Sequence, residues 1–200
     1  WAGSGMFEDP LLNIFVSTDR GVSFDPVTNF GGDSLGYISG MATHPTDPST
    51  AYLLFSYFQS PKIFRTTDLG ETWEELSGFG GDSVSSNGFP DVSIHDLLVM
   101  PHDPNVIWAA TEIGIVESLD NGATWNLLES DFPSVSVYQL DYQDDQIILA
   151  THGRGIWTAG NFELPEEEEE EDDTSVEERL AAGLLVYPNP VRDKLFIRFN

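Results

Sequence analysis

Cysteine is absent from the 200 residues, and basic residues are scarce, with eight Lys and Arg against 34 Asp and Glu. The absence of cysteine excludes disulfides, thiol chemistry and zinc–thiolate sites. The acidic excess repels phosphate backbones and anionic lipid, so we expect nucleic acid and membrane surfaces to be poor partners. No run of about 18 apolar residues occurs, and the sequence therefore predicts no transmembrane segment.

What is present is a hydrophobic fraction of 40% and an aromatic fraction of 12%, which exclude a wholly disordered chain. The charge is uneven: residues 1–162 carry 22 acidic and 4 basic side chains, and residues 163–179 carry 11 and 1. The sequence starts at Trp1 and stops at Asn200 inside an alternating run. We interpret it as a fragment, so the lack of a signal peptide says nothing about its compartment.

An eight-residue motif occurs three times, as STDRGVSF at 17–24, TTDLGETW at 66–73 and SLDNGATW at 118–125, with its Asp residues 49 and 52 positions apart. Between the copies lie short β-branched and aromatic runs separated by turn residues, which is typical of antiparallel strands. Four such runs in about 50 residues indicate a β-propeller blade. A β-sandwich with chance similarity between hairpins is the alternative.

The segment 135–158 begins a further unit but is not followed by the motif. A unit that ends early suggests a terminal blade, completed by a strand from upstream of this sequence. The composition then changes abruptly, because eight consecutive carboxylates run from Glu166 to Asp173. These charges repel each other and favour an extended conformation, in which residues 163–179 would reach at most about 55 Å. Ser175 and Glu178 fit a capping box for a short helix to about Ala182.

We therefore predict an all-β chain in three parts. Residues 1–162 form the C-terminal, four-stranded antiparallel blades of a partial β-propeller. Residues 163–183 form an acidic, largely disordered linker. Residues 184–200 begin a small, truncated β-sandwich domain, because LLVYPNP ends in a turn and KLFIRF alternates in polarity.

The recurring motif has a structural explanation at each position. An Asp in a tight turn accepts hydrogen bonds from backbone N–H groups one or two residues on, Gly allows a positive φ, and the hydroxyls bond the turn backbone. The final aromatic side chain is expected to pack between neighbouring strands. A catalytic motif would occur once, so we predict a structural role for Ser17, Asp19, Gly21, Ser23, Phe24, Thr66, Asp68, Gly70, Thr72, Trp73, Ser118, Asp120, Gly122, Thr124 and Trp125.

These elements resemble the Asp-box, or BNR repeat, of β-propellers such as sialidases, xyloglucan-cleaving enzymes and sortilin-type receptors. In those proteins the box lies at the blade periphery, away from the ligand, and is structural. ATHGRGIW at 150–157 resembles the end of the sortilin-like propellers found in secreted bacterial proteins. The resemblance covers about 14–160, and the first copy departs from it with Ser23 and Phe24 in place of Thr and Trp.

The tail has a resemblance of its own. VYPNPVRDKLFI at 186–197 is similar to the start of the C-terminal sorting domain of the type IX secretion system in Bacteroidota. The resemblance implies export to the medium or to the outer surface of a Gram-negative bacterium, with the secretion machinery as partner. The residues that carry it are Tyr187, Pro188, Asn189, Pro190, Asp193 and Leu195.

No catalytic or metal-binding constellation stands out. A sialidase needs an arginine triad, but 1–162 contains only Arg20, Arg65 and Arg154, two of them in or beside the motif. Glycoside hydrolysis needs two carboxylates, and no pattern selects a pair. The four histidines do not have metal-ligand spacing, so we predict no metal and no cofactor. The carboxylates weighed as candidates and interpreted as solvated or turn residues are Asp96, Glu112 and Asp141.

Two Gly- and Ser-rich segments, 30–36 and 77–91, connect one blade to the next. They are interpreted as flexible connectors, with a ligand-lining role as the alternative. His44, His102 and the His152–Arg154 stretch are interpreted as turns, with weak binding by Arg154 as a hypothesis.

The favoured function is a non-catalytic binding or scaffold module for a polysaccharide or protein ligand. The alternative is a glycoside hydrolase with its catalytic carboxylates outside this sequence.

Overall fold

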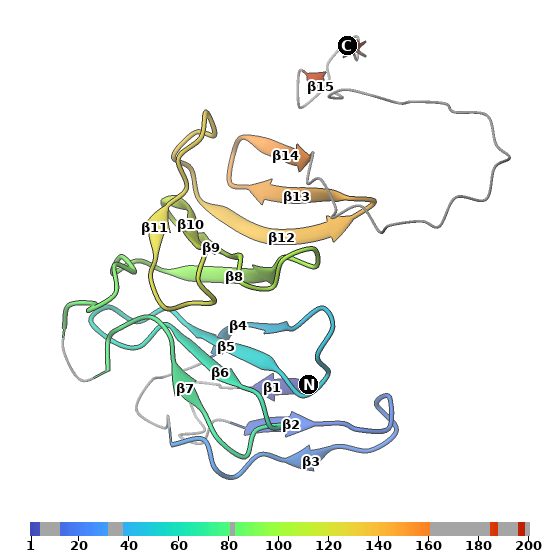
Figure 1. The fold of residues 1–200 in the computed structure, drawn as a ribbon, viewed down its shortest axis with the longest axis vertical. Helices are drawn as coiled ribbons and strands as arrows, with labels where there is room; N and C mark the ends of the chain where they lie inside the picture. Colours follow the sequence, from blue (N-terminus) through green and yellow to red (C-terminus); the bar gives the residue numbers. More distant parts are fainter. Residues whose placement is uncertain (5–12, 32–37, 81–82, 161–184, 188–195, 199–200) are drawn as a thin grey trace, which may run out of the picture.

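The computed structural model describes residues 1–4, 13–31, 38–80, 83–160, 185–187 and 196–198. All regular structure in these residues is β-strand, and strands β1 to β14 form four antiparallel sheets in chain order (Figure 1). The strands are β1 (Ala2–Ser4), β2 (Asn13–Val16) and β3 (Asp25–Pro26) in the first sheet; β4 (Ile38–Thr43), β5 (Ala51–Phe55), β6 (Ile63–Thr66) and β7 (Glu74–Glu75) in the second; β8 (Ile94–Val99), β9 (Ile107–Thr111), β10 (Gly114–Ser118) and β11 (Asn126–Leu127) in the third; and β12 (Val137–Gln143), β13 (Gln146–Thr151) and β14 (Gly155–Gly160) in the fourth.

Each sheet is a simple meander in which every strand pairs with the strands before and after it. The sheets stack face to face along the chain (Figure 1), and β8, the first strand of the third sheet, contacts both β4 and β12. The first strands of successive sheets are therefore neighbours, as in the inner ring of a propeller. The prediction of an all-β, partial propeller with four-stranded antiparallel blades is confirmed.

The hydrophobic core lies between the sheets. Separate clusters centre on Phe55 between the first and second sheets, Trp125 between the second and third, and Trp108 between the third and fourth. Strands β5 (AYLLF) and β9 (IWAAT) are buried along their whole length because a sheet covers each of their faces. Their sequences are accordingly continuous apolar runs rather than alternating ones.

The two ends of each sheet are built differently. At one end, the recurring turn bonds to the turn between the first two strands: Leu69 N donates to Ser49 O (3.1 Å) and Asn121 N to Asn105 O (2.8 Å). We call this the turn end. At the opposite end, which we call the loop end, the hairpin between the second and third strands meets the connector that enters the sheet. There Glu112 N donates to Ser93 O (3.1 Å).

The first strands of the second, third and fourth sheets share one irregularity. Register shifts occur between Ile38 and Gly40, between Ile94 and Asp96, and between Val137 and Gln139, all at the loop end. One additional residue is thereby inserted in each strand at the same position. These β-bulge residues are Ser39, His95 and Tyr138.

The fourth strands of the second and third sheets are short. Strands β7 and β11 start one residue after Trp73 and Trp125 and pair over two positions only. The reason is that the aromatic side chain packs against the preceding sheet. In the fourth sheet, the described residues provide three strands, and β14 pairs with β13.

The C-terminal segment contains one described hairpin. Strand β15 (Leu185–Tyr187) pairs antiparallel with β16 (Phe196–Arg198). The acidic linker, the helix expected to about Ala182 and the sorting-motif residues from Pro188 to Leu195 lie outside the described residues. The boundaries at 162/163 and 183/184 therefore stay predictions.

Candidate functional site

The recurring turns are closed by one carboxylate each. In the middle copy, Asp68 Oδ1 accepts hydrogen bonds from Thr72 N (2.8 Å) and Thr66 Oγ1 (2.8 Å), and Asp68 Oδ2 accepts from Thr72 Oγ1 (2.5 Å). Thr66 Oγ1 in turn accepts from Gly70 N (2.8 Å). The Asp therefore reaches the residue four positions on, rather than one or two as the sequence suggested.

The other two copies repeat this geometry. Asp19 accepts from Ser17, Val22 and Ser23, and Asp120 from Ser118 and Thr124, while Ser17 Oγ and Ser118 Oγ accept from the N–H of Gly21 and Gly122. All three glycines have positive φ, at 84°, 92° and 88°. The residue before each glycine also has positive φ; these residues are Arg20, Leu69 and Asn121.

The hydrogen bonds shift the acidity of the turn carboxylates. The Ser23 hydroxyl and backbone N–H lower the pKa of Asp19 to about 2, and the Thr72 and Thr124 hydroxyls lower the pKa values of Asp68 and Asp120. These carboxylates are ionised at neutral pH and bonded within their own turns. This arrangement explains turn formation and does not direct the carboxylates toward a ligand.

The aromatic residue of the motif behaves differently in each copy. Trp125 is 2% exposed, and its Nε1 donates to Leu76 O of the second sheet (2.8 Å). Trp73 packs against Phe30, but its buried Nε1 has no hydrogen-bond partner among the residues that the structure describes. Phe24 is 47% exposed, against the expectation of burial. Each Trp packs against the sheet before its own, and the described residues contain no sheet before that of Phe24.

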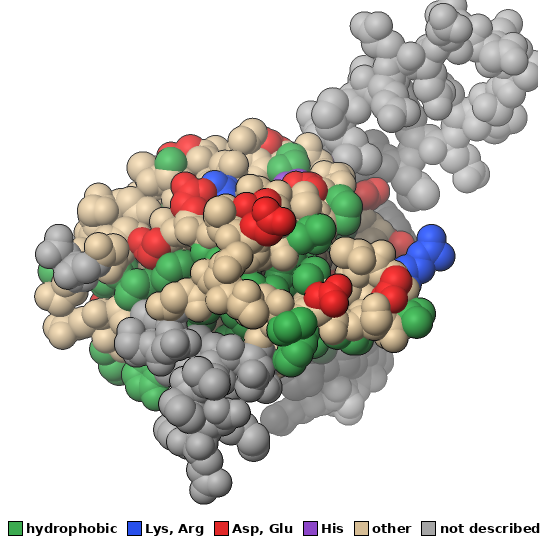
Figure 2. All heavy atoms as spheres, turned by 90° about the horizontal axis from the view of Figure 1, so that it is seen from below, with side chains coloured by type: hydrophobic (Ala, Val, Ile, Leu, Met, Phe, Trp, Pro, Cys, Tyr) green, Lys and Arg blue, Asp and Glu red, His purple; other side chains and the backbone are tan. Residues whose placement is uncertain are grey.

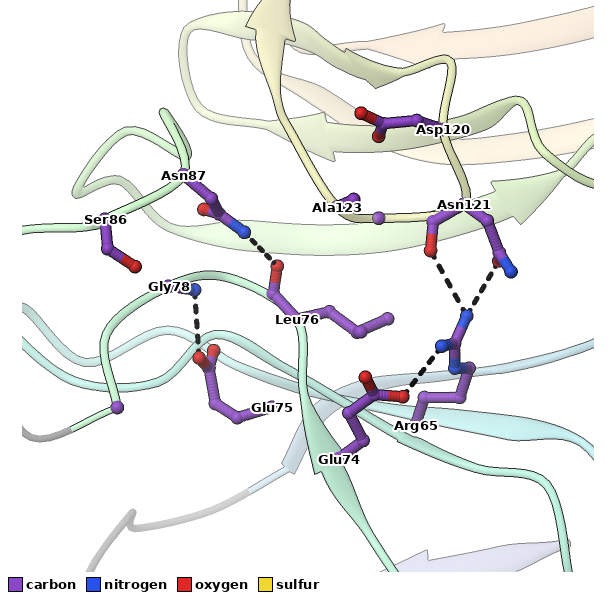
Figure 3. Close-up of a pocket in the computed structure, with 12 residues that line it drawn as sticks. Arg65, Glu74, Glu75, Leu76, Gly78, Ser86, Asn87, Asp120, Asn121 and Ala123 are labelled. Carbon is purple, nitrogen blue, oxygen red and sulfur yellow. Dashed lines mark hydrogen bonds and ion pairs between the residues drawn. The ribbon is translucent and has the colours of Figure 1, made fainter.

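A polar groove of about 500 Å³ lies at the turn end between the second and third sheets (Figure 3). Arg65 crosses it: its Nη1 donates to Asn121 Oδ1 (2.7 Å) and Asn121 O (3.2 Å), and its Nη2 contacts Glu74 Oε2 (2.7 Å). Glu75 accepts from Gly78 N (2.9 Å). Arg65 and Glu74 are thus engaged with each other, and Arg65 joins the second sheet to the third.

The exposed aromatic side chains of the loop end form a different kind of surface. Tyr57 and Phe58, in the loop between β5 and β6, are 45% and 69% exposed. Tyr138 is 52% exposed, and its ring stacks on His95 (centroids 4.6 Å apart, 28° between planes). His152, in the hairpin between β13 and β14, meets the same Tyr ring edge-on (5.7 Å, 74°).

A buried lysine holds the loop of Tyr57 and Phe58 in place. The Lys62 side chain is fully buried, pairs with Asp91 (2.8 Å) and donates to the Tyr57 carbonyl. Asp91 also accepts from Gln59 N (2.9 Å), where the backbone has a φ of 53°. Two aromatic side chains are therefore presented to solvent by a loop that an internal ion pair fixes.

The candidate carboxylates are engaged with the backbone. Asp96 Oδ2 accepts from Leu140 N (2.9 Å) and so joins β8 to β12, and burial raises the pKa of Asp96. Glu112 accepts from Ser93 N (3.0 Å) and Asp141 from Tyr142 N (2.8 Å). Of the predicted turn residues, His44 Nδ1 accepts from Asp47 N (3.0 Å). These contacts do not assemble a catalytic pair.

No three His, Asp or Glu side chains in the described part of the chain come close enough together to hold a metal ion. The described residues also contain no helix long and apolar enough to cross a membrane. On the face shown in Figure 2, acidic side chains are more abundant than basic ones and are interspersed with hydrophobic and uncharged groups.

Sequence reasoning missed two features of the loop end: the Lys62–Asp91 pair and the bulges that present His95 and Tyr138. The signal for the bulges is present in the sequence. Ser39, His95 and Tyr138 each follow an Ile or Val, in YISG, SIHD and SVYQ, at the start of three successive units. The ion pair joins residues 29 positions apart, and nothing local indicates it.

Comparison with known proteins agrees with this architecture. Residues 12–155 match the model of the Sortilin-Vps10 family, described as sortilin, neurotensin receptor 3. No curated protein matches the sequence. Among solved structures, the GH74 xyloglucanase from Xanthomonas campestris is similar over 74% of this chain and 26% of its own, with 17% identity and a TM-score of 0.53.

A second similar structure is the GH74 enzyme from Niastella koreensis. It aligns with 74% of this chain and 25% of its own, with 16% identity and a TM-score of 0.53. The chain therefore spans about a quarter of the length of these structures. At such identity, the likeness shows the propeller fold alone.

Proposed function

The chain belongs to the Sortilin-Vps10 family, and from this membership we propose that it is a non-catalytic binding module whose ligand lies on the loop end. The observation that carries the proposal is the contrast between the two ends. At the turn end, the recurring polar groups bond to each other. At the loop end, Tyr57, Phe58 and Tyr138 are fixed by neighbouring side chains and yet remain about half exposed or more.

The recurring turns are structural Asp-boxes in this proposal. Their Asp, Gly and hydroxyl residues close the turn by the same hydrogen bonds in all three copies, which supports one shared structural role. Arg65, which bonds to the third turn from the second sheet, adds a connection between blades.

The second candidate is a glycoside hydrolase. Its support is the likeness to the two GH74 structures, of which this chain spans about a quarter, so catalytic carboxylates would lie in other parts of the whole protein. The two candidates are separated by incubating full-length protein with plant and algal glucans. The binding module releases no reducing ends, and robust release would overturn it.

Export by the type IX secretion system is the second part of the proposal. The sequence of 186–197 supports it, and the described hairpin of β15 and β16 agrees with a domain that starts as β-structure. The module would then be secreted or attached to the outer surface of a Gram-negative bacterium. A reporter fused to the complete C-terminal region should reach the surface of a type IX-competent bacterium, and retention in the periplasm would contradict this part.

A further inference from the structure

The inner strands carry the same bulge at the same position in three successive sheets. A β-bulge redirects the side chain of the inserted residue, and bulges are over-represented next to functional sites. The inserted residues, Ser39, His95 and Tyr138, all lie at the loop end, on strands that neighbour each other. We call these three residues the bulge row.

The first two members of the bulge row, Ser39 and His95, each contact the next sheet. Ser39 Oγ donates to Ile94 O (3.0 Å), the carbonyl directly before His95. The His95 ring stacks on Tyr138, and its Nε2 lies 3.4 Å from Ser136 Oγ. The row is thus continuous from the second sheet to the fourth, and it ends in the half-exposed Tyr138 ring.

The backbone is shaped to permit this row. A Cβ atom on Gly40 would lie 2.7 Å from the carbonyl oxygen of His95, which is closer than real Cβ contacts come. The positions equivalent to Gly40 in the next two strands are occupied by Asp96 and Gln139. Gly40 therefore allows β4 to approach the backbone of His95 at the bulge of β8.

The chemistry of the row selects the class of ligand. Tyr138 offers an aromatic surface, while Ser136, His95 and His152 beside it offer hydroxyl and imidazole groups that donate and accept hydrogen bonds. Burial lowers the pKa of His95, although Glu112 opposes the shift, so this ring is uncharged at neutral pH. An apolar ring surface bordered by hydroxyl and imidazole groups matches a pyranose, whose C–H face stacks on aromatic rings and whose hydroxyls point outward.

The surrounding charge and the small size of the site exclude two other classes of ligand, polyanions and protein partners. The chain has a net charge of −26, and Glu112 and Asp141 lie on or beside the strands that carry the row. Polyanions such as uronate polymers are repelled by this field. A protein partner needs an interface of about 1,000 Å² or more, which is large in comparison with a platform of one Tyr and two His rings.

We propose that the bulge row, with His152, is a binding site for a neutral saccharide that stacks on Tyr138. The proposal rests on the proposed binding function and adds the ligand class and the contact residues. His95 acts as a positioning residue that supports the Tyr138 ring, and Gly40 positions His95.

The test measures binding of full-length protein to immobilised neutral hexasaccharides of glucose, xylose and mannose, with polygalacturonate and a lysine-rich peptide as further probes. Binding to at least one neutral probe should weaken about tenfold in Tyr138→Ala, the effect of losing one stacking contact. The matched control is Leu119→Ala, an exposed apolar residue at the turn end, and it should bind as the parent does.

Gly40→Ala provides a second variant that leaves all ligand-contacting side chains in place. It should weaken the same binding about threefold or more, with the far-ultraviolet circular dichroism unchanged. If Gly40→Ala does not fold, Tyr138→Phe retains the ring and should preserve binding within about twofold.

Three outcomes would overturn the proposal: no binding to any neutral probe, binding unaffected by Tyr138→Ala, or Tyr138-dependent binding only to polygalacturonate or the peptide. The release of reducing ends from the probes would instead contradict the non-catalytic function. Because binding and release are measured separately, failure of the saccharide site and failure of the proposed function are distinguishable.

Discussion

The two tryptophans of the recurring turns provide a direct measurement of one inter-sheet hydrogen bond. Trp125 Nε1 donates to Leu76 O, whereas no described residue accepts a hydrogen bond from the buried Trp73 Nε1. Replacement by Phe removes the indole N–H and a similar volume at both sites. Trp125→Phe loses a hydrogen bond of about 1 kcal/mol, and Trp73→Phe removes an unsatisfied donor that costs about 1–3 kcal/mol when buried. We expect Trp125→Phe to be the more destabilising by about 2–4 kcal/mol.

The expected cost at Trp125 is limited because Leu76 O has another donor. Asn87 Nδ2 also bonds to it (2.8 Å; Figure 3), so the carbonyl stays satisfied in Trp125→Phe. Removing both donors would leave a buried acceptor without a partner. The double variant Trp125→Phe/Asn87→Ala should therefore be destabilised by about 1 kcal/mol more than the sum of the single variants.

The assay is equilibrium unfolding in urea, followed by far-ultraviolet circular dichroism so that loss of a Trp does not remove the signal. Asn87→Ala alone is the required control, because Asn87 also bonds to Ser85. Equal destabilisation by Trp73→Phe and Trp125→Phe would refute the reasoning, and so would strict additivity in the double variant.

Three further predictions concern the turns and the buried lysine. Gly70→Ala should destabilise the fold by at least about 1 kcal/mol because φ is 92°. The effect should be larger than that of Gly21→Ala, since a Cβ at Gly70 would lie 2.9 Å from Val27 and a Cβ at Gly21 would lie 3.9 Å from Phe24. Equal urea midpoints for the two variants would contradict this. The pKa values of Asp19 and Asp47 are lowered from 3.8 to about 2, so their contribution to stability is complete above pH 3.8 and is lost as the pH falls toward 2. The thermal midpoint should therefore drop in that window, less steeply in Asp19→Asn, whereas the raised pKa of Asp96 acts in the opposite direction. A pH profile of the variant that runs parallel to that of the parent would refute the assignment. Lys62→Met leaves the partly exposed Asp91 without its cation and should destabilise by about 1–3 kcal/mol. It should also speed hydrogen exchange at the Gln59 amide, which donates to Asp91, and unchanged exchange would show that the ion pair does not fix the loop.

The sequence predicted the fold because its signals are local and repeated. The Asp and Gly of each turn and the apolar runs of β5 and β9 lie within short segments, so periodicity alone locates them. The candidate site was less accessible. Lys62 and Asp91 meet through tertiary packing, and His95 stacks on Tyr138 from another sheet 43 positions away. Such pairings depend on how the sheets are stacked, which local patterns do not specify.

The exposure of Phe24 has the same origin. Its turn satisfies the local motif, but the burial of the aromatic residue depends on a preceding sheet. The β-bulges were also missed because a register shift is a relation between two strands. Local rules therefore predict the turns well, while contacts between sheets determine which side chains stay exposed.

The separate cores between successive sheets have a consequence for how this architecture can grow. Each hydrophobic cluster is shared by two adjacent sheets, so the folding free energy is approximately a sum of sheet terms and nearest-neighbour terms. Duplication of one unit therefore adds a sheet together with the apolar faces that a neighbouring sheet needs. The inner-strand positions 39, 95 and 138 are not part of these clusters, so they can diverge from copy to copy while the packing between sheets is kept.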